Sequence, residues 1–185
     1  MTTPRPKRRA DLFVDPQNDP REGGPTLADE RTTLMEYLRW QRQTLELKCD
    51  GLGAADLARR SVEPSTMSLL GLVRHMADVE RAWFRRRMAN LDAPPYYRTD
   101  DDPDGDFDGA VADPAVVDEA WRRWADEIAF ANQFVAEAPN LDITGTGHQG
   151  PVSLREVLVH MVEEYACHNG HADLLRERID GRVGQ

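Results

Sequence analysis

Four long stretches of the chain repeat apolar residues with the period of an α-helix, and this repetition limits the possible folds more than any other feature. In each stretch the apolar residues recur three or four positions apart, so they would line one side of a helix. No segment alternates apolar and polar residues as a half-buried strand does. The sequence therefore predicts an all-α protein, an up-down four-helix bundle. The predicted helices span about residues 27–49, 68–90, 114–138 and 153–179.

The ends of these stretches carry the residues that helix termini prefer. Asp113 followed by Pro114 is typical of a helix start, because the aspartate accepts hydrogen bonds from free amides and proline fits the first turn. Ser153 and Glu156 form a capping box before the last stretch. Gly181 can adopt the left-handed conformation that ends many helices. These signals support the helix boundaries that the apolar period predicts.

The beginning of the chain has a different character. Residues 1–25 are rich in proline and charge and show no apolar period. Such a segment cannot bury enough apolar surface to offset the entropy of ordering, so we predict a poorly ordered N-terminal arm outside the core. Residues 26–185 would then form one bundle domain, which is long enough to bury a real hydrophobic core.

Composition and charge argue against several classes of protein. The formal net charge of −10 disfavours nucleic-acid binding, which needs a basic surface. No apolar run approaches the roughly 20 residues that cross a bilayer, and the basic residues 1–9 are not followed by the apolar stretch of a secretory signal. Two cysteines, Cys49 and Cys167, are too few for a disulfide framework, and we interpret Cys167 as structural. We expect a cytoplasmic protein with no nucleic-acid or membrane partner.

Three residues on two of the predicted helices have the pattern of a metal site. Glu164 and His168 are four positions apart, which places a carboxylate and an imidazole side by side on one helix. His75 on the second predicted helix would supply a third ligand. Bundles build metal sites from residues on facing helices, and three protein ligands leave a position open for water or substrate. The alternative is that these side chains only form hydrogen bonds with one another.

Further histidines lie near this cluster in the sequence. His160 and His171 fall close to the same flank of the last helix, and His148 lies in the preceding connection. Because histidine titrates near neutral pH, these residues are candidates to support the ligands or to transfer protons.

Two other polar features have structural interpretations. Glu80 falls within the apolar face of its helix, so it needs a partner, and Arg31 and Arg42 are the candidates for a structural ion pair. The acidic stretch 100–113 could suggest calcium, but it does not match the spacing of an EF-hand loop. We predict that this stretch is a solvated loop.

Two blocks of the sequence resemble the DinB/YfiT-like superfamily of metalloenzymes. The blocks are SLLGLVRHMADVERAW at 68–83 and VHMVEEYACHNGHADLLR at 159–176, and the likeness extends over about residues 27–182. Within the superfamily they are similar to an actinobacterial branch of mini-circle-protein type. The resemblance implies a four-helix bundle, often a homodimer, that holds one divalent metal ion through His75, Glu164 and His168.

One of these ligands departs from the usual pattern of the superfamily, in which both ligands on the last helix are commonly histidines. Glu164 takes the place of the first of them, which is similar to the branch of mycothiol-dependent maleylpyruvate isomerase. The resemblance thus implies a small-molecule substrate and a low-molecular-weight thiol, mycothiol, as cosubstrate.

The ligand set allows more than one chemistry. Two imidazoles and a carboxylate suit Zn²⁺ best, and Ni²⁺, Fe²⁺ or Mn²⁺ as well. Zn²⁺ would favour the thiolate form of a thiol, as an S-transferase or isomerase requires, and the same open position could activate water for hydrolysis. A non-catalytic metal- or ligand-binding bundle with a stress-related role, and a purely structural dimeric bundle, also remain open.

Overall fold

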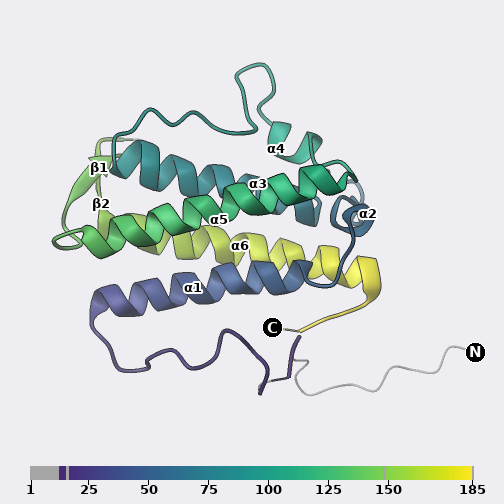
Figure 1. Cartoon of the computed structure of the whole chain (residues 1–185), viewed down its shortest axis with the longest axis horizontal. Helices are drawn as coiled ribbons and strands as arrows, with labels where there is room; N and C mark the ends of the chain where they lie inside the picture. Colours follow the sequence, from purple (N-terminus) through teal and green to yellow (C-terminus); the bar gives the residue numbers. More distant parts are fainter. Residues whose placement is uncertain (1–12, 16, 148, 185) are drawn as a thin grey trace, which may run out of the picture.

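The computed structural model describes residues 13–15, 17–147 and 149–184, and its four long helices lie side by side in one bundle (Figure 1). The prediction of an all-α bundle is confirmed. The long helices are α1 (Glu30–Cys49), α3 (Leu69–Glu80) with its continuation η1 (Arg81–Met88), α5 (Pro114–Glu137) and α6 (Leu154–Asp180). The short elements are α2 (Ala54–Leu57), α4 (Gly105–Asp108), β1 (Thr144–Thr146) and β2 (Pro151–Ser153).

The predicted helix ends are close to the observed ones. The side chain of Asp113 accepts a hydrogen bond from the first turn of α5, and Ser153 does the same for α6. Gly181 ends α6 with a φ of 79°. At α1 the cap is Asp29, whose carboxylate accepts from the amide of Thr32, so this helix starts at residue 30 rather than 27.

The directions of the long helices follow the order up, down, down, up, which refines the expected up-down bundle. Arg155 pairs with Glu30 near the start of α6 and α1, and Asp173 pairs with Lys48 near their ends, so these two helices are parallel. The helices α3 and α5 also run in the same direction (Figure 1). They are joined by a long crossover, residues 89–113, which returns along the bundle and carries α4.

The second long helix changes its winding after Glu80. The segment η1 is a π-helix, and beyond its end the amide of Ala89 still donates to the carbonyl of Phe84, five residues earlier. The apolar period predicted one uninterrupted α-helix here, because one wider stretch hardly disturbs the pattern. Wider turns of this kind are frequent at functional sites.

A small hairpin closes one end of the bundle. The strands β1 and β2 pair antiparallel, with Thr144 opposite Ser153. This hairpin could not be predicted from the sequence, because strands of three residues are too short to show alternation. A Cβ atom added at Gly145 would collide with the carbonyl oxygen of Arg87, so the hairpin lies directly against η1.

The interior contains the ion pair that the sequence predicted. Glu80 is fully buried, and Nε of Arg42 donates to its Oε1 at 2.7 Å. Tyr165 donates a further hydrogen bond to the same oxygen at 2.8 Å. Arg31, the other candidate, instead donates to the carbonyl oxygens of Val135 and Ala138 at the end of α5.

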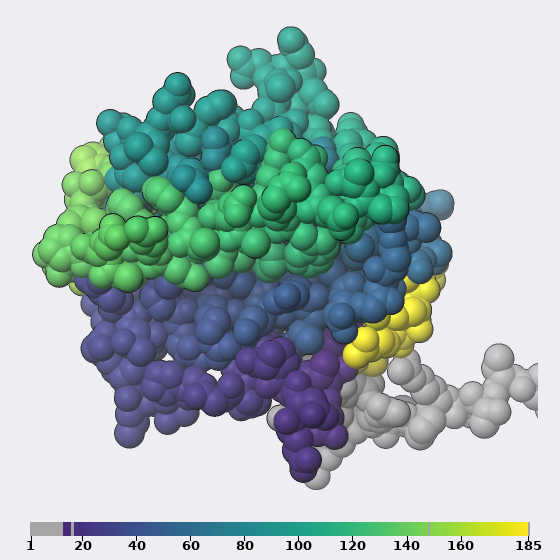
Figure 2. Space-filling model, in the orientation of Figure 1, coloured from purple at the N-terminus to yellow at the C-terminus, as the bar shows by residue number. Residues whose placement is uncertain are grey.

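Part of the N-terminal segment contacts the bundle. Phe13 and Arg21 are buried, with the Phe13 ring 4.2 Å from Nζ of Lys48 and 3.9 Å from the guanidinium of Arg182. Arg21 donates to Thr44 of α1 at 3.1 Å. The division of the chain at residue 25 stays a prediction, but the described residues before it do not stand apart from the bundle, as Figure 2 shows for the purple segment beneath α1.

Two remaining expectations concern cysteine and the membrane. Cys167, which the sequence suggested to be structural, is exposed, whereas Cys49 is buried and burial raises the pKa of its thiol to about 12. In the described part of the chain, no helix has the length and apolar character that crossing a bilayer requires.

Candidate metal centre

The structure brings His75 of α3 together with Glu164 and His168 of α6. Each residue offers one ligand atom, and these three atoms lie within 4.8 Å of one another. The rings of His75 and His168 meet edge to face, with their centroids 4.7 Å apart. The cluster forms because α3 and α6 are neighbours and because residues four apart share one side of a helix. This is the grouping that the sequence predicted, and it could hold one metal ion.

The ring of His75 is fixed from behind by Asp106. Its Nδ1 lies 2.8 Å from Oδ2 of Asp106, and Phe107 stacks on the ring at 5.4 Å. Since Nδ1 is engaged, Nε2 is the ring nitrogen left to bind a metal. Metal-binding histidines usually donate their second N–H to a carboxylate or carbonyl in this way, which fixes the tautomer and makes the ligand nitrogen more basic.

Asp106 was missed by the sequence analysis, which placed it in a solvated loop. For this residue the prediction is wrong, because α4 carries Asp106 into the protein, where only 1% of its surface is exposed. Arg74 holds α4 in place by donating to the carbonyl oxygens of Gly105 and Asp106, both at 2.8 Å. A Cβ atom at Gly109 would collide with Arg74. Phe107 between two glycines was the signal that this loop packs against a helix.

Glu164 occupies the centre of a row of histidines on α6. Its Oε2 lies 3.5 Å from Nε2 of His168, and its Oε1 lies 3.2 Å from Nε2 of His160. The hydrogen bond with His168 is the main cause that lowers the pKa of Glu164, with further contributions from the charges of His160 and His75, while burial opposes the shift. The carboxylate is therefore ionised near neutral pH and can serve as an anionic ligand.

Two imidazole nitrogens at this site lack hydrogen-bond partners within the described residues. They are Nδ1 of His168 and Nδ1 of His171, and both atoms are buried. Buried polar atoms of this kind need a partner, such as a water molecule or an ion. Burial, followed by the charge of His168, lowers the pKa of His171, whose ring lies 5.5 Å from that of His168. The donor set, imidazole nitrogens around one carboxylate, suits a divalent cation.

The other predicted histidines have different outcomes. His160 contacts Glu164, as described, and its ring packs against Trp83 of η1 at 4.6 Å between centroids. His171 lies beside His168 at the opposite end of the row. His148 lies outside the described residues. Trp83 could not be predicted as part of this region, because its position looked like one more residue of an apolar face.

Comparison with solved structures supports the fold. The chain is similar to a structure described as the conserved protein of a locus from Enterococcus faecalis, with a TM-score of 0.56 and 17% sequence identity. The match covers 84% of this chain and 99% of the other. A search among curated proteins gave no match.

Comparison with family models is more specific. The model described as mycothiol S-transferase matches residues 33–181, which include all the helices of the bundle except the first three residues of α1. This family is DinB/YfiT-like, in agreement with the resemblance noted in the sequence. The matched range contains the three candidate metal ligands and Asp106, which contacts one of them, His75. The chain therefore belongs to the mycothiol S-transferase family.

Proposed function

We propose that the protein is a metal-dependent S-transferase that joins the sulfur of mycothiol to a small electrophilic substrate. The observation that carries this proposal is the cluster of His75, Glu164 and His168 inside the range matched by the family model. Mycothiol is a cysteinyl thiol carried on an amino sugar that is linked to inositol. In the proposed reaction the thiol sulfur forms a bond to a carbon of the substrate. The leaving group departs with the electron pair of the broken bond, and the thiol proton passes to a protein base and then to solvent.

The residues of the cluster have distinct roles in this proposal. Nε2 of His75, a carboxylate oxygen of Glu164 and a ring nitrogen of His168 would hold the metal ion, Zn²⁺ in the first place. A bound divalent cation stabilises the thiolate form of a thiol near neutral pH. Asp106 keeps the ring of His75 aimed at the site. His171 lies beside His168 and has a buried nitrogen with no partner among the described residues, so it could hold the proton that the thiol loses.

The metal content tests the first half of the proposal. Protein purified without a chelator and without a nickel column should contain one divalent ion per chain. The double variant His75→Ala/His168→Ala should contain none, whereas a variant of the exposed Glu163, next to the cluster, should keep its metal. Stoichiometric metal in the double variant would show that the ligands are wrongly assigned.

Co²⁺ substitution tests the second half. Direct thiolate binding to Co²⁺ gives an intense charge-transfer band in the near ultraviolet, so titrating mycothiol into the Co²⁺ protein should produce this band. Mass spectrometry should then detect the thioether that mycothiol forms with a chloromethyl electrophile. Chloride should be released in an equal amount. If saturating thiol leaves the spectrum unchanged and no conjugate forms, water activation for hydrolysis or a non-catalytic role becomes the better reading. Sedimentation of the same samples tests the homodimer, which stays a prediction.

A further inference from the structure

A small cavity lies next to the metal cluster, between α6, η1 and the turn of the hairpin. It has a volume of about 290 Å³ and is lined by His160, whose Nε2 is 3.2 Å from Oε1 of Glu164. One side chain therefore separates the cavity from a predicted metal ligand. Nothing in the ligand assignment explains this cavity, because none of the three ligands lines it.

The cavity and the cluster both take residues from α6 and from the antiparallel helix formed by α3 and η1. Where these two helices meet at the cluster, His75 faces His168, with 4.7 Å between ring centroids. Eight residues later in α3–η1 and eight residues earlier in α6, Trp83 faces His160, with 4.6 Å between ring centroids. With a rise of about 1.5 Å per residue, the two pairs are roughly 12 Å apart, and Glu164 lies midway between them. A molecule of modest length could lie in the cavity and reach the metal.

The chemistry of the cavity wall indicates what kind of group it would take. Trp83 offers an indole, Val152 and Val157 add apolar surface, and Gln149 and Glu156 add an amide and a carboxylate. Aromatic surface combined with a few placed hydrogen-bonding groups is the usual composition of a small-molecule site. A sugar or inositol ring matches it, since its C–H bonds can pack on the indole while its hydroxyls donate to the carboxylate and the amide oxygen. The volume suffices for about one such ring.

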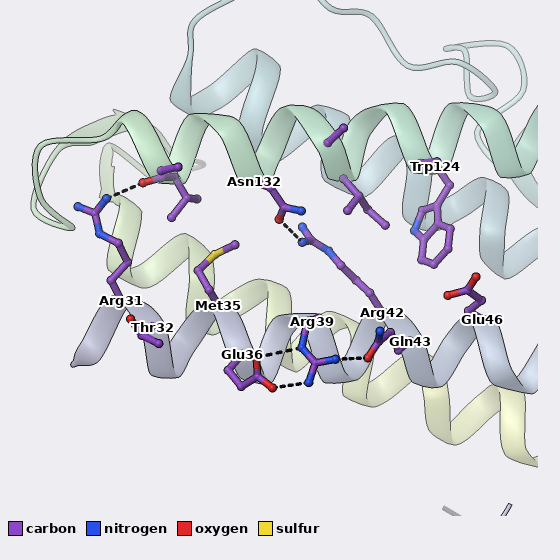
Figure 3. Close-up of a pocket in the computed structure, with 15 residues that line it drawn as sticks. Arg31, Thr32, Met35, Glu36, Arg39, Arg42, Gln43, Glu46, Trp124 and Asn132 are labelled. Carbon is purple, nitrogen blue, oxygen red and sulfur yellow. Dashed lines mark hydrogen bonds and ion pairs between the residues drawn. The ribbon is translucent and has the colours of Figure 1, made fainter. Parts of the chain in front are cut away.

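A larger groove is the competing location, and Figure 3 shows it between α1 and α5. Its volume is about 740 Å³, and its walls include Met35, Ile128 and Val135. The buried polar groups along it are already paired: Arg42 donates to Asn132 at 2.9 Å and to Glu80. None of the three metal-cluster residues lines this groove. A thiol cosubstrate must lie close to the metal ligands, and this groove does not.

We infer that the cavity beside His160 binds one ring of the polyhydroxylated, glycosidic part of the thiol cosubstrate, with Trp83 as the surface on which that ring packs. The inference rests on the proposed function, because it assumes that the cosubstrate is a glycoside carrying a thiol. The cysteinyl arm of such a molecule then extends between the two helices, past Glu164, so that its sulfur reaches the ligand cluster. His160 lines the cavity and contacts Glu164, which makes it a positioning residue at the boundary.

The test uses the thiol-free glycoside, glucosaminyl-inositol, as the probe and the full-length metal-loaded protein. Calorimetry should detect its binding to the wild type. Trp83→Ala should weaken that binding about tenfold or more, Trp83→Phe should weaken it less, and Val152→Trp, which fills the cavity, should abolish it. Ile128→Trp, which fills the groove between α1 and α5, should change the dissociation constant by less than about twofold. Metal content and thermal midpoint should stay as in the wild type for at least Trp83→Phe and Ile128→Trp.

The outcomes separate this inference from the proposed function. Unchanged affinity in Trp83→Ala, or loss of binding in Ile128→Trp alone, would overturn the assignment of the cavity. If the wild type does not bind the glycoside but mycothiol still produces the Co²⁺ band, the cavity assignment fails and the proposed function stands. If the glycoside binds in a Trp83-dependent way but no thiolate band forms, the proposed function fails and the cavity remains a glycoside site.

Discussion

Nδ1 of His75 and Oδ2 of Asp106 lie 2.8 Å apart, although 31 positions separate the two residues in the chain. The contact joins the metal cluster to the crossover between α3 and α5, which is otherwise remote from α6 in sequence. It also means that the cluster depends on a residue whose only visible property in the sequence is that it is one acid among many.

The first prediction concerns this carboxylate. Asp106→Asn should weaken metal binding about 10- to 100-fold, because the amide no longer fixes the tautomer of His75 or raises the basicity of its Nε2. Competition with a chelator of known affinity measures the change. The control is Asp108→Asn on the same short helix, since Asp108 is exposed and pairs only with Arg60 in the described structure. Equal metal affinity in both variants would mean that Asp106 merely supports the fold.

The second prediction concerns the buried ion pair. Glu80→Gln should lower the free energy of unfolding by about 3–5 kcal/mol, because Arg42 is 5% exposed and would keep its charge without a counterion. Urea denaturation measures the change. The double variant Arg42→Met/Glu80→Met should recover much of the loss, since neither charge then remains buried. The control is Asp56→Asn, which breaks an exposed pair with Arg59 and should cost about 1 kcal/mol at most. A single variant as stable as the wild type would contradict the pairing.

The third prediction concerns Phe13, which the sequence placed in the arm. Phe13→Ala should lower the free energy of unfolding by about 1.5–3 kcal/mol, because the ring is 6% exposed and packs against Lys48 and Arg182. Removing residues 1–20 should therefore lower the thermal midpoint, whereas the sequence alone led us to expect almost no change. Removing residues 1–12 is the matched comparison, because it leaves Phe13 in place. Equal midpoints for the two truncations would show that the contact of Phe13 contributes nothing.

The fourth prediction concerns pH. Arg21 donates to both carboxylate oxygens of Asp19, and this side-chain hydrogen bonding is the main cause that lowers the pKa of Asp19 below its ordinary value of 3.8. A lowered folded-state pKa means that the pair stabilises the folded protein above pH 3.8 and that this contribution is lost as the pH falls through the folded-state value. Asp19→Asn should therefore be less stable than the wild type at pH 7. Its deficit should shrink below pH 3.8, as thermal unfolding between pH 3 and pH 7 can show. A deficit independent of pH would assign the effect to packing.

The parts of this structure that could be predicted from the sequence are those that depend on local periodicity. The helix pattern and caps such as Ser153 are properties of a few neighbouring residues, so a single chain displays them. The pairing of Glu80 with Arg42 was also foreseeable, because a carboxylate within an apolar stripe has few ways to be satisfied. The i,i+4 spacing placed Glu164 beside His168 for the same local reason.

What the sequence did not reveal depends on how distant segments pack. Asp106 becomes a partner of His75 only because glycines allow α4 to lie close to α3. The wall formed by Trp83 depends on the winding of η1 and on the hairpin against it, and neither leaves an apolar period. The helix order up, down, down, up follows from where the crossover docks, which no local pattern encodes.

The docking of the crossover has a thermodynamic consequence. Asp106 reaches His75 only while α4 is packed in place, so a metal ion held by His75 also favours the packed state of residues 89–113. Coupling between two equilibria is reciprocal: the factor by which the docked crossover raises metal affinity equals the factor by which bound metal opposes its detachment. An ion bound at this site would thus stabilise the docking of a connection that it does not touch. Protection of the crossover backbone against hydrogen exchange becomes a direct readout of whether the site is filled.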